Sequence, residues 1–93
     1  DKKLRAFAAQ NDVMIFVAGR KSSNGKVLFA ICRDANPRTY FIEDVDEIDA
    51  QWFRGAENVG ISGATSTPHW LMQNVKEEIE RIATPQSIHV STN

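Results

Sequence analysis

Residues 13–17 form an unbroken apolar run, VMIFV, which is rich in β-branched side chains. A strand with one face in water alternates apolar and polar residues, so an unbroken run indicates a strand that is buried on both faces. Strands of this kind are typical of parallel sheets that helices cover on both sides. Even with Ala18 added, the run is far too short to cross a bilayer.

The rest of the chain alternates between helical and strand patterns. Strand patterns cover residues 13–17, 39–42 and 58–61. Helical patterns precede, separate and follow these strands: the end of a helix around Leu4, Phe7 and Ala8, a helix carrying Val27, Leu28, Ile31 and Cys32, and a last helix carrying Leu71, Val75, Ile79 and Ile82. A short helix with Asp49 as its N-cap carries Trp52 and Phe53 between the second and third strands. Pro37 stops the second helix, Pro68 lies in the first turn of the last one, and Thr84 and Pro85 end it. Residues 87–90 form either a last, edge strand or an ordered tail.

This order of elements predicts a single α/β domain over residues 1–93. We expect three layers, with a small parallel sheet of three to four strands between helices on both faces. The expected strand order is 2-1-3 for the first three strands. A chain of 93 residues is long enough for one hydrophobic core but not for two.

Composition excludes several classes of protein. Lys and Arg total 11 against 12 Asp and Glu, so the chain lacks the basic surplus of a general nucleic-acid binder. Its one cysteine, Cys32, cannot form an internal disulfide or hold an iron–sulfur cluster alone. No segment has the pattern of a signal peptide. We therefore expect a cytoplasmic protein with no nucleic-acid or membrane partner, and, because the chain begins at Asp1 without Met, a piece of something longer.

Two loops share one design. The first loop, residues 19–25, follows the strand at 13–17, and the second loop, residues 62–67, follows the strand at 58–61. Both are rich in glycine and hydroxyl groups, and both lead directly into a helix, whose N-terminus attracts anions. Because parallel strands end at the same edge of a sheet, both loops are expected on one rim. In the order 2-1-3 they flank the crevice where the strand order reverses.

The side chains of these loops favour phosphate or diphosphate as the ligand. The predicted donors and charges are Ser22, Ser23, Asn24 and Ser66, with Arg20, Lys21 and Lys26 adding positive charge and Gly25 and Gly63 allowing close approach. Glu43 and Asp44 follow the second strand, would repel phosphate, and are expected outside the crevice. The competing interpretation is that such residues only cap helices, each contributing about 1 kcal/mol. Two such loops on one rim favour a binding site.

Five segments carry a resemblance to a known family. They are residues 21–24, 40–43, 46–49, 52–53 and 59–68, which read KSSN, YFIE, DEID, WF and VGISGATSTP. In this order they closely resemble the C-terminal part of the LytB family of hydroxymethylbutenyl diphosphate reductases. The resemblance covers nearly the whole chain. The second loop departs from the commoner family pattern in the position of its glycine.

The resemblance implies a role in isoprenoid synthesis by the non-mevalonate (MEP) pathway. Enzymes of this family have three similar α/β domains, and a [4Fe-4S] cluster in the full-length enzyme removes the hydroxyl of 4-hydroxy-3-methylbut-2-enyl diphosphate (HMBPP) by two-electron reductive dehydration. The products are isopentenyl and dimethylallyl diphosphate, and the implied electron donor is of the ferredoxin or flavodoxin type. The diphosphate-binding residues of the family fall on Ser22, Ser23, Asn24 and Ser66.

The chain lacks the three cluster cysteines and the histidine and glutamate motifs of the family, and Cys32 lies where the family has no cluster ligand. We therefore assign no catalytic and no metal-ligating residue, and expect His69 and His89 to face solvent. The isolated domain is expected to be inactive and without a cofactor, its partners being the two N-terminal domains of the same chain. The alternative is a non-enzymatic phosphate-ligand or partner-binding α/β module, which would bind its ligand tightly on its own.

Overall fold

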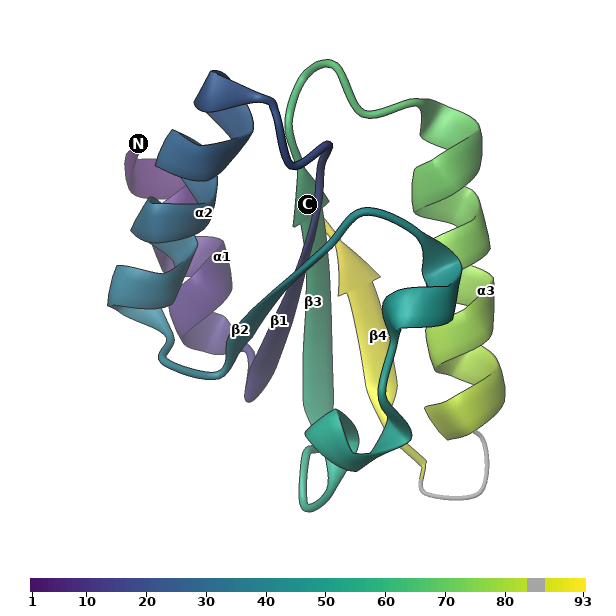
Figure 1. Cartoon of the computed structure of the whole chain (residues 1–93). Helices are drawn as coiled ribbons and strands as arrows, with labels where there is room; N and C mark the ends of the chain where they lie inside the picture. The colour runs from purple at the N-terminus through teal and green to yellow at the C-terminus, as the bar shows by residue number, and fades with distance from the viewer. Residues whose placement is uncertain (84–86) are drawn as a thin grey trace.

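The computed structural model describes residues 1–83 and 87–93. Its four described strands, β1 (Val13–Val17), β2 (Thr39–Ile42), β3 (Asn58–Gly63) and β4 (His89–Thr92), form one sheet in the order β2-β1-β3-β4. Every neighbouring pair is parallel (Figure 1). This confirms the predicted fold class and the order 2-1-3, and the chain after residue 87 provides the edge strand rather than a tail.

Helices cover both faces of this sheet. Helices α1 (Lys2–Gln10) and α2 (Ser23–Ala35) lie on one face, and α3 (His69–Ala83) lies on the other, together with two short 3₁₀ helices, η1 (Val45–Glu47) and η2 (Ala50–Phe53) (Figure 1). Asp49 caps η2 by accepting the N–H of Gln51 at 2.9 Å, as its position predicts. The domain therefore has three layers, and α2 and α3 lie on opposite sides of the strands that precede them.

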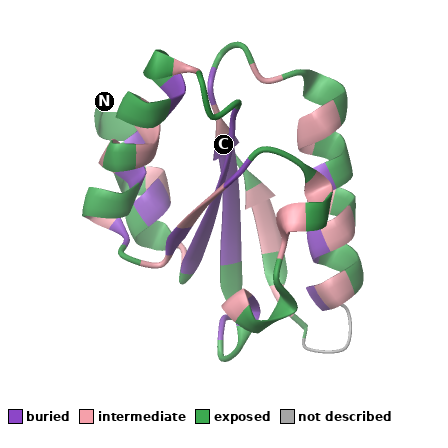
Figure 2. Ribbon diagram, in the orientation of Figure 1, coloured by how far each residue is buried: buried purple, intermediate pink, exposed green. Residues whose placement is uncertain are grey.

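Strand β1 divides the core in two. All five of its residues are fully buried (Figure 2). Val13, Ile15 and Val17 point into the cluster under α3, which includes Val75 and Ile79 of that helix, whereas its other residues point towards α1 and α2. Side chains alternate between the two faces of a strand, so a strand with a helical layer on each side is apolar throughout. This explains the unbroken run at 13–17.

A close approach of α1 to the sheet requires glycine at position 60. A Cβ at Gly60 would lie 2.8 Å from the ring of Phe7 and 2.7 Å from the sulfur of Met14. Real Cβ atoms are essentially never found so near other heavy atoms, so a larger residue here would force the contacting side chains to shift.

Some boundaries and packing assignments differ from the sequence predictions. Strand β3 continues two residues past 61 because its partner β1 continues to Val17, which pairs with Gly63. The last helix begins at His69, with Pro68 just outside it. Val27 does not join the apolar face of α2, and its side chain is 59% exposed. The predicted helix end at residues 84 and 85 lies outside the described residues.

The aromatic residues take three different environments. Phe53 is fully buried in the core, and Trp52 stacks on Tyr40 with ring centroids 4.3 Å apart. Trp70 does not pack in this way, because it lies in the first turn of α3 with 64% of its surface exposed. Among the described large apolar residues, Trp70 and Val27 are the exposed ones, and each belongs to the first half of a helix that follows a candidate loop.

We expect Val75→Ala to lower the free energy of unfolding by about 2–3 kcal/mol, because it removes two buried methyl groups and leaves a cavity between α3 and β1. The matched control is Val27→Ala, which makes the same change on an exposed helical surface and should alter stability by less than about 0.5 kcal/mol. Urea unfolding of both variants measures the difference. Equal losses in the two variants would contradict the assignment of the core.

Candidate phosphate-binding rim

The two candidate loops lie at the same edge of the sheet. Both follow the carboxyl ends of neighbouring parallel strands, β1 and β3, and Val17 at the end of β1 pairs with Gly63 at the end of β3 (Figure 1). A Cβ at Gly63 would lie 2.7 Å from the carbonyl oxygen of Val17, so the close approach of the two strand ends depends on glycine here. The structure therefore brings together the two segments that the sequence predicted on one rim.

The first loop is a tight turn followed by a helix cap. The N–H of Ser22 donates to the carbonyl of Gly19 at 3.0 Å, and the hydroxyl oxygen of Ser22 accepts the N–H of Gly25 at 3.0 Å. Ser22 is thus the N-cap of α2, and Ser23 and Asn24 occupy its first turn rather than a loop. This corrects the predicted boundary, and it places both residues where main-chain N–H groups have no partner inside the helix.

Capping does not account for all the polar groups of this turn. The side chains of Ser23 and Asn24 are exposed, and neither makes a hydrogen bond within the described part of the chain. Ser22 uses its oxygen as an acceptor, so its hydroxyl proton remains available as a donor. The first turn of α2 therefore presents three side-chain donors beside a helix N-terminus.

The second loop is held against the end of β1 by Thr67. Its hydroxyl donates to the carbonyl of Val17 at 2.7 Å, and its N–H donates to the carbonyl of Ala64 at 3.0 Å. Ser66, the predicted donor, is exposed and makes no side-chain hydrogen bond among the described residues. Thr67 is not among the predicted donors, because a contact across 50 residues leaves no signal in local spacing.

Arg20 is not available to a ligand in the way its sequence position suggests. Its guanidinium pairs with Glu43 at 2.9 Å and also with Glu47. The acidic segment after β2 therefore contacts the first loop through Arg20. The expectation that Glu43 and Asp44 lie outside the crevice stays a prediction. Lys21 and Lys26 are exposed and have no carboxylate partner within residues 1–83 and 87–93. The unpaired positive charge of this loop comes from these two lysines.

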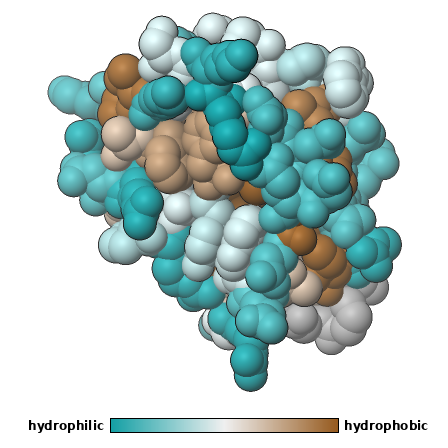
Figure 3. Space-filling model, viewed as in Figure 1, coloured by the Kyte–Doolittle hydropathy of each residue, from teal (hydrophilic) through white to brown (hydrophobic). Residues whose placement is uncertain are grey.

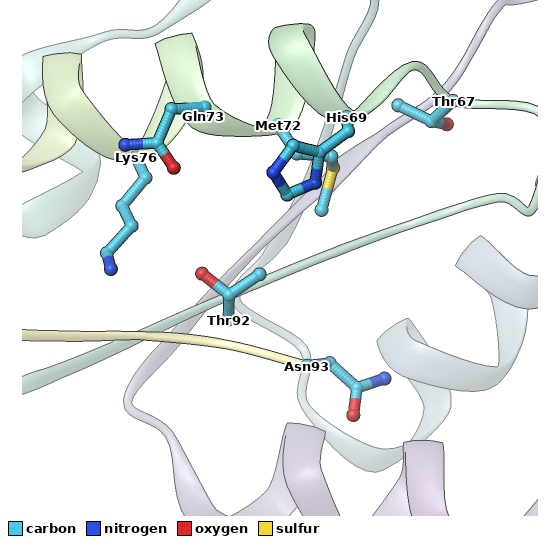
Figure 4. A pocket seen from close by; sticks show the side chains of 7 residues that line it. All are labelled: Thr67, His69, Met72, Gln73, Lys76, Thr92 and Asn93. Atoms are coloured by element: carbon cyan, nitrogen blue, oxygen red, sulfur yellow. The ribbon is translucent and has the colours of Figure 1, made fainter.

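A hollow of about 420 Å³ adjoins the second loop on the β4 side. Figure 4 shows its lining, which comes from Thr67, from α3 and from the end of β4: Thr67, His69, Met72, Gln73, Lys76, Thr92 and Asn93. His69 is exposed, as predicted, and it forms part of this lining. None of the predicted donors, Ser22, Ser23, Asn24 and Ser66, lines this hollow.

The donor set of this chain does not suit an iron–sulfur cluster. Cys32 is fully buried in α2, and burial raises the pKa of its thiol to about 11, which keeps it protonated near neutral pH. Among the described residues there is no group of three His, Cys, Asp or Glu side chains that could hold a metal ion. None of the described helices is both long and apolar enough to span a membrane.

The fold and its rim define a class of protein: a parallel α/β domain whose neutral donors and helix N-termini suit an anionic ligand. Residues 1–80 match the sequence profile of the family described as LytB protein. The chain belongs to this family.

Relatives in the same family are named 4-hydroxy-3-methylbut-2-enyl diphosphate reductase. One from Chlorobaculum tepidum is 60% identical over 84 residues, and one from Chlorobaculum parvum is 61% identical over 82 residues, which cover 85% and 83% of this chain. The chain spans only about a quarter of the length of these relatives, 25% in both cases.

Two solved structures share the fold. One, titled as the structure of (E)-4-hydroxy-3-methyl-but-2-enyl diphosphate reductase, the terminal enzyme of the non-mevalonate pathway, has a TM-score of 0.83 and 40% identity. The alignment covers 86% of this chain and 28% of that one. A reductase from Plasmodium falciparum has a TM-score of 0.79 over 98% of this chain and 28% of its own, but at 21% identity it supports the fold alone.

We expect Thr67→Val to loosen the second loop, because it keeps the shape of the side chain but removes the hydrogen bond to Val17. Unfolding free energy should fall by about 1 kcal/mol, and amide hydrogen exchange in residues 63–67 should become faster. Thr67→Ser retains the hydroxyl and serves as the control, with exchange close to that of the unaltered chain. Faster exchange in the serine variant than in the valine variant would contradict this role.

Proposed function

We propose that this chain binds the diphosphate group of HMBPP in a 4-hydroxy-3-methylbut-2-enyl diphosphate reductase, through Ser22, Ser23, Asn24 and Ser66. The observation that carries the proposal is the meeting of two donor-bearing segments at one rim, with Val17 paired to Gly63 between them. Family membership supports the substrate class, because the relatives are named as reductases of a diphosphate ester.

The chemistry of the rim suits a diphosphate. Two helix N-termini, those of α2 and α3, follow the two loops, and each carries unpaired N–H groups and partial positive charge. Hydroxyl and amide groups add donors whose hydrogen bonds to a charged oxygen contribute about 1.5–3 kcal/mol each. A diphosphate has enough acceptor oxygens to use donors from both loops at once.

In this proposal the rest of a longer chain does the redox chemistry. The [4Fe-4S] cluster and its cysteines belong to the two N-terminal domains, and electrons arrive from a ferredoxin or flavodoxin-type donor in the cytoplasm. When bound, the cluster supplies the two-electron reductive dehydration that yields isopentenyl and dimethylallyl diphosphate. This domain holds the charged end of the substrate so that its reacting end is correctly placed, and it is inactive alone.

In the full-length reductase, we expect Ser23→Ala to raise the KM for HMBPP about 10- to 100-fold, because it removes one hydrogen bond to a charged phosphate oxygen. The matched control is Ser91→Ala, which deletes the same group from β4, away from both loops, and should leave KM within about twofold. Steady-state kinetics of both variants provide the measurement. Unchanged KM in the Ser23 variant would remove the basis for assigning this residue to the diphosphate.

A second experiment separates the reductase domain from the alternative, a phosphate-binding or partner-binding module that works by itself. We expect inorganic pyrophosphate to bind the 93-residue chain only weakly, with a Kd in the millimolar range, since donors from the missing domains are absent. Titration followed by amide chemical shifts should move the signals of residues 22–24 and 63–67. Micromolar binding would favour the independent module, and no shift at all would favour a domain that serves protein contacts only.

A further inference from the structure

Arg20, in the tight turn after β1, is held by a carboxylate from the loop after β2. One oxygen of Glu43 accepts the main-chain N–H of Arg20 at 2.9 Å, and the other accepts a guanidinium N–H of the same residue, also at 2.9 Å. One carboxylate therefore fixes both the backbone and the side chain of Arg20. In a simple surface ion pair only the side chains would be joined.

Glu47 fixes the segment that carries Glu43. Its carboxylate accepts the N–H groups of Glu43 and Asp44, each at 3.0 Å, and completes a capping box at the start of η1. It also accepts hydrogen bonds from the Arg20 guanidinium, which lowers the pKa of the Glu47 carboxyl below its usual range and raises the pKa of Arg20. The ends of β1 and β2 are thus joined by one network of charge-assisted hydrogen bonds.

The backbone that this network holds leads directly into the candidate binding turn. Because Ser22 donates its N–H to Gly19, Arg20 and Lys21 are the two central residues of a β-turn. Ser22 at the end of that turn caps α2, and Ser23 and Asn24 follow at once. A shift of the Arg20 backbone would therefore move the start of α2 and, with it, the three donor side chains.

We infer that Glu43 is a positioning residue for the diphosphate-binding turn, holding the backbone of Arg20 so that Ser22, Ser23 and Asn24 face the ligand; the inference rests on the proposed function. The opposite expectation is that a carboxylate beside a phosphate site only weakens binding by repulsion. The two expectations differ in sign. Loss of Glu43 weakens diphosphate binding if it positions the turn, and strengthens binding if it merely neutralises Arg20.

The exposure of these side chains indicates whether the network affects folding stability or ligand binding. The side chains of Arg20 and Glu43 are 56% and 47% exposed, and exposed ion pairs contribute little to folding stability. Figure 3 shows hydrophilic side chains over much of one face, beside an apolar area on the α2 side. Phe29 and Phe41 line a shallow hollow together with Arg20 and Lys26. We therefore expect the effect of Glu43 to fall on ligand binding and not on the melting temperature.

The test uses the full-length reductase and two variants of one residue. Glu43→Ala removes both acceptors of Arg20, whereas Glu43→Gln keeps one acceptor oxygen and loses the charge. We expect the alanine variant to raise both the KM for HMBPP and the inhibition constant of inorganic pyrophosphate about tenfold, with kcat within about twofold. The glutamine variant should raise both by less than about threefold. Melting temperatures should stay within about 3 °C.

The control is Asp46→Asn, which removes a carboxylate from the same acidic segment at a residue with no hydrogen bond or ion pair in the described chain. It should leave the KM and the inhibition constant unchanged, whereas an increase equal to that of Glu43→Ala would assign the effect to a general disturbance of the acidic segment and overturn the inference. Tighter pyrophosphate binding in Glu43→Ala would also overturn it, as would a large fall in melting temperature with kcat and KM both altered.

Ser23→Ala is measured in parallel to separate the two proposals. If Ser23→Ala raises KM and Glu43→Ala does not, the positioning role is wrong and the proposed function stands. If neither Ser23→Ala nor Asn24→Ala raises KM, the proposed function itself fails.

Discussion

The pairing of Val17 with Gly63 is the contact on which the rest of the rim depends. At this point the ends of β1 and β3 approach so closely that a Cβ on residue 63 would lie 2.7 Å from the Val17 carbonyl oxygen. The same oxygen accepts the hydroxyl of Thr67. One main-chain carbonyl therefore limits where β3 ends and where the second loop turns, and both strands must be in register before either loop is correctly placed.

The contact between Val17 and Gly63 lies at the end of the buried strand β1, between the two helical layers. Helices cover both faces of this strand, with α2 on one face of the sheet and α3 on the other. Each of these two helices nevertheless begins at the same carboxyl edge of the sheet. Two helix N-termini thus follow strands that end at one edge of the sheet. A single strand–helix unit would supply one such terminus. A diphosphate, whose negative charge lies on the oxygens of two phosphoryl groups, is better matched by two.

The sequence was informative where local patterns decide the structure. The apolar run at 13–17 and the cap at Asp49 follow from periodicity and capping chemistry. Contacts between distant residues had no such signal. Glu43 meets Arg20 across 23 residues and Thr67 meets Val17 across 50, and spacing within one loop cannot reveal either bond. Charge counting alone therefore included Arg20 among the free positive charges of the first loop, although Arg20 pairs with Glu43.

In the proposed reaction, HMBPP and its products carry the same diphosphate. Interactions with an unchanged group bind substrate and product equally, so making them stronger slows product release without lowering the barrier of the chemical step. Neutral hydroxyl and amide donors fix the orientation of the group at moderate affinity. A bidentate arginine would bind it more tightly. Arg20 is committed to Glu43 and Glu47. In the proposed site the phosphate contacts therefore fall to neutral donors, which suit both binding and release.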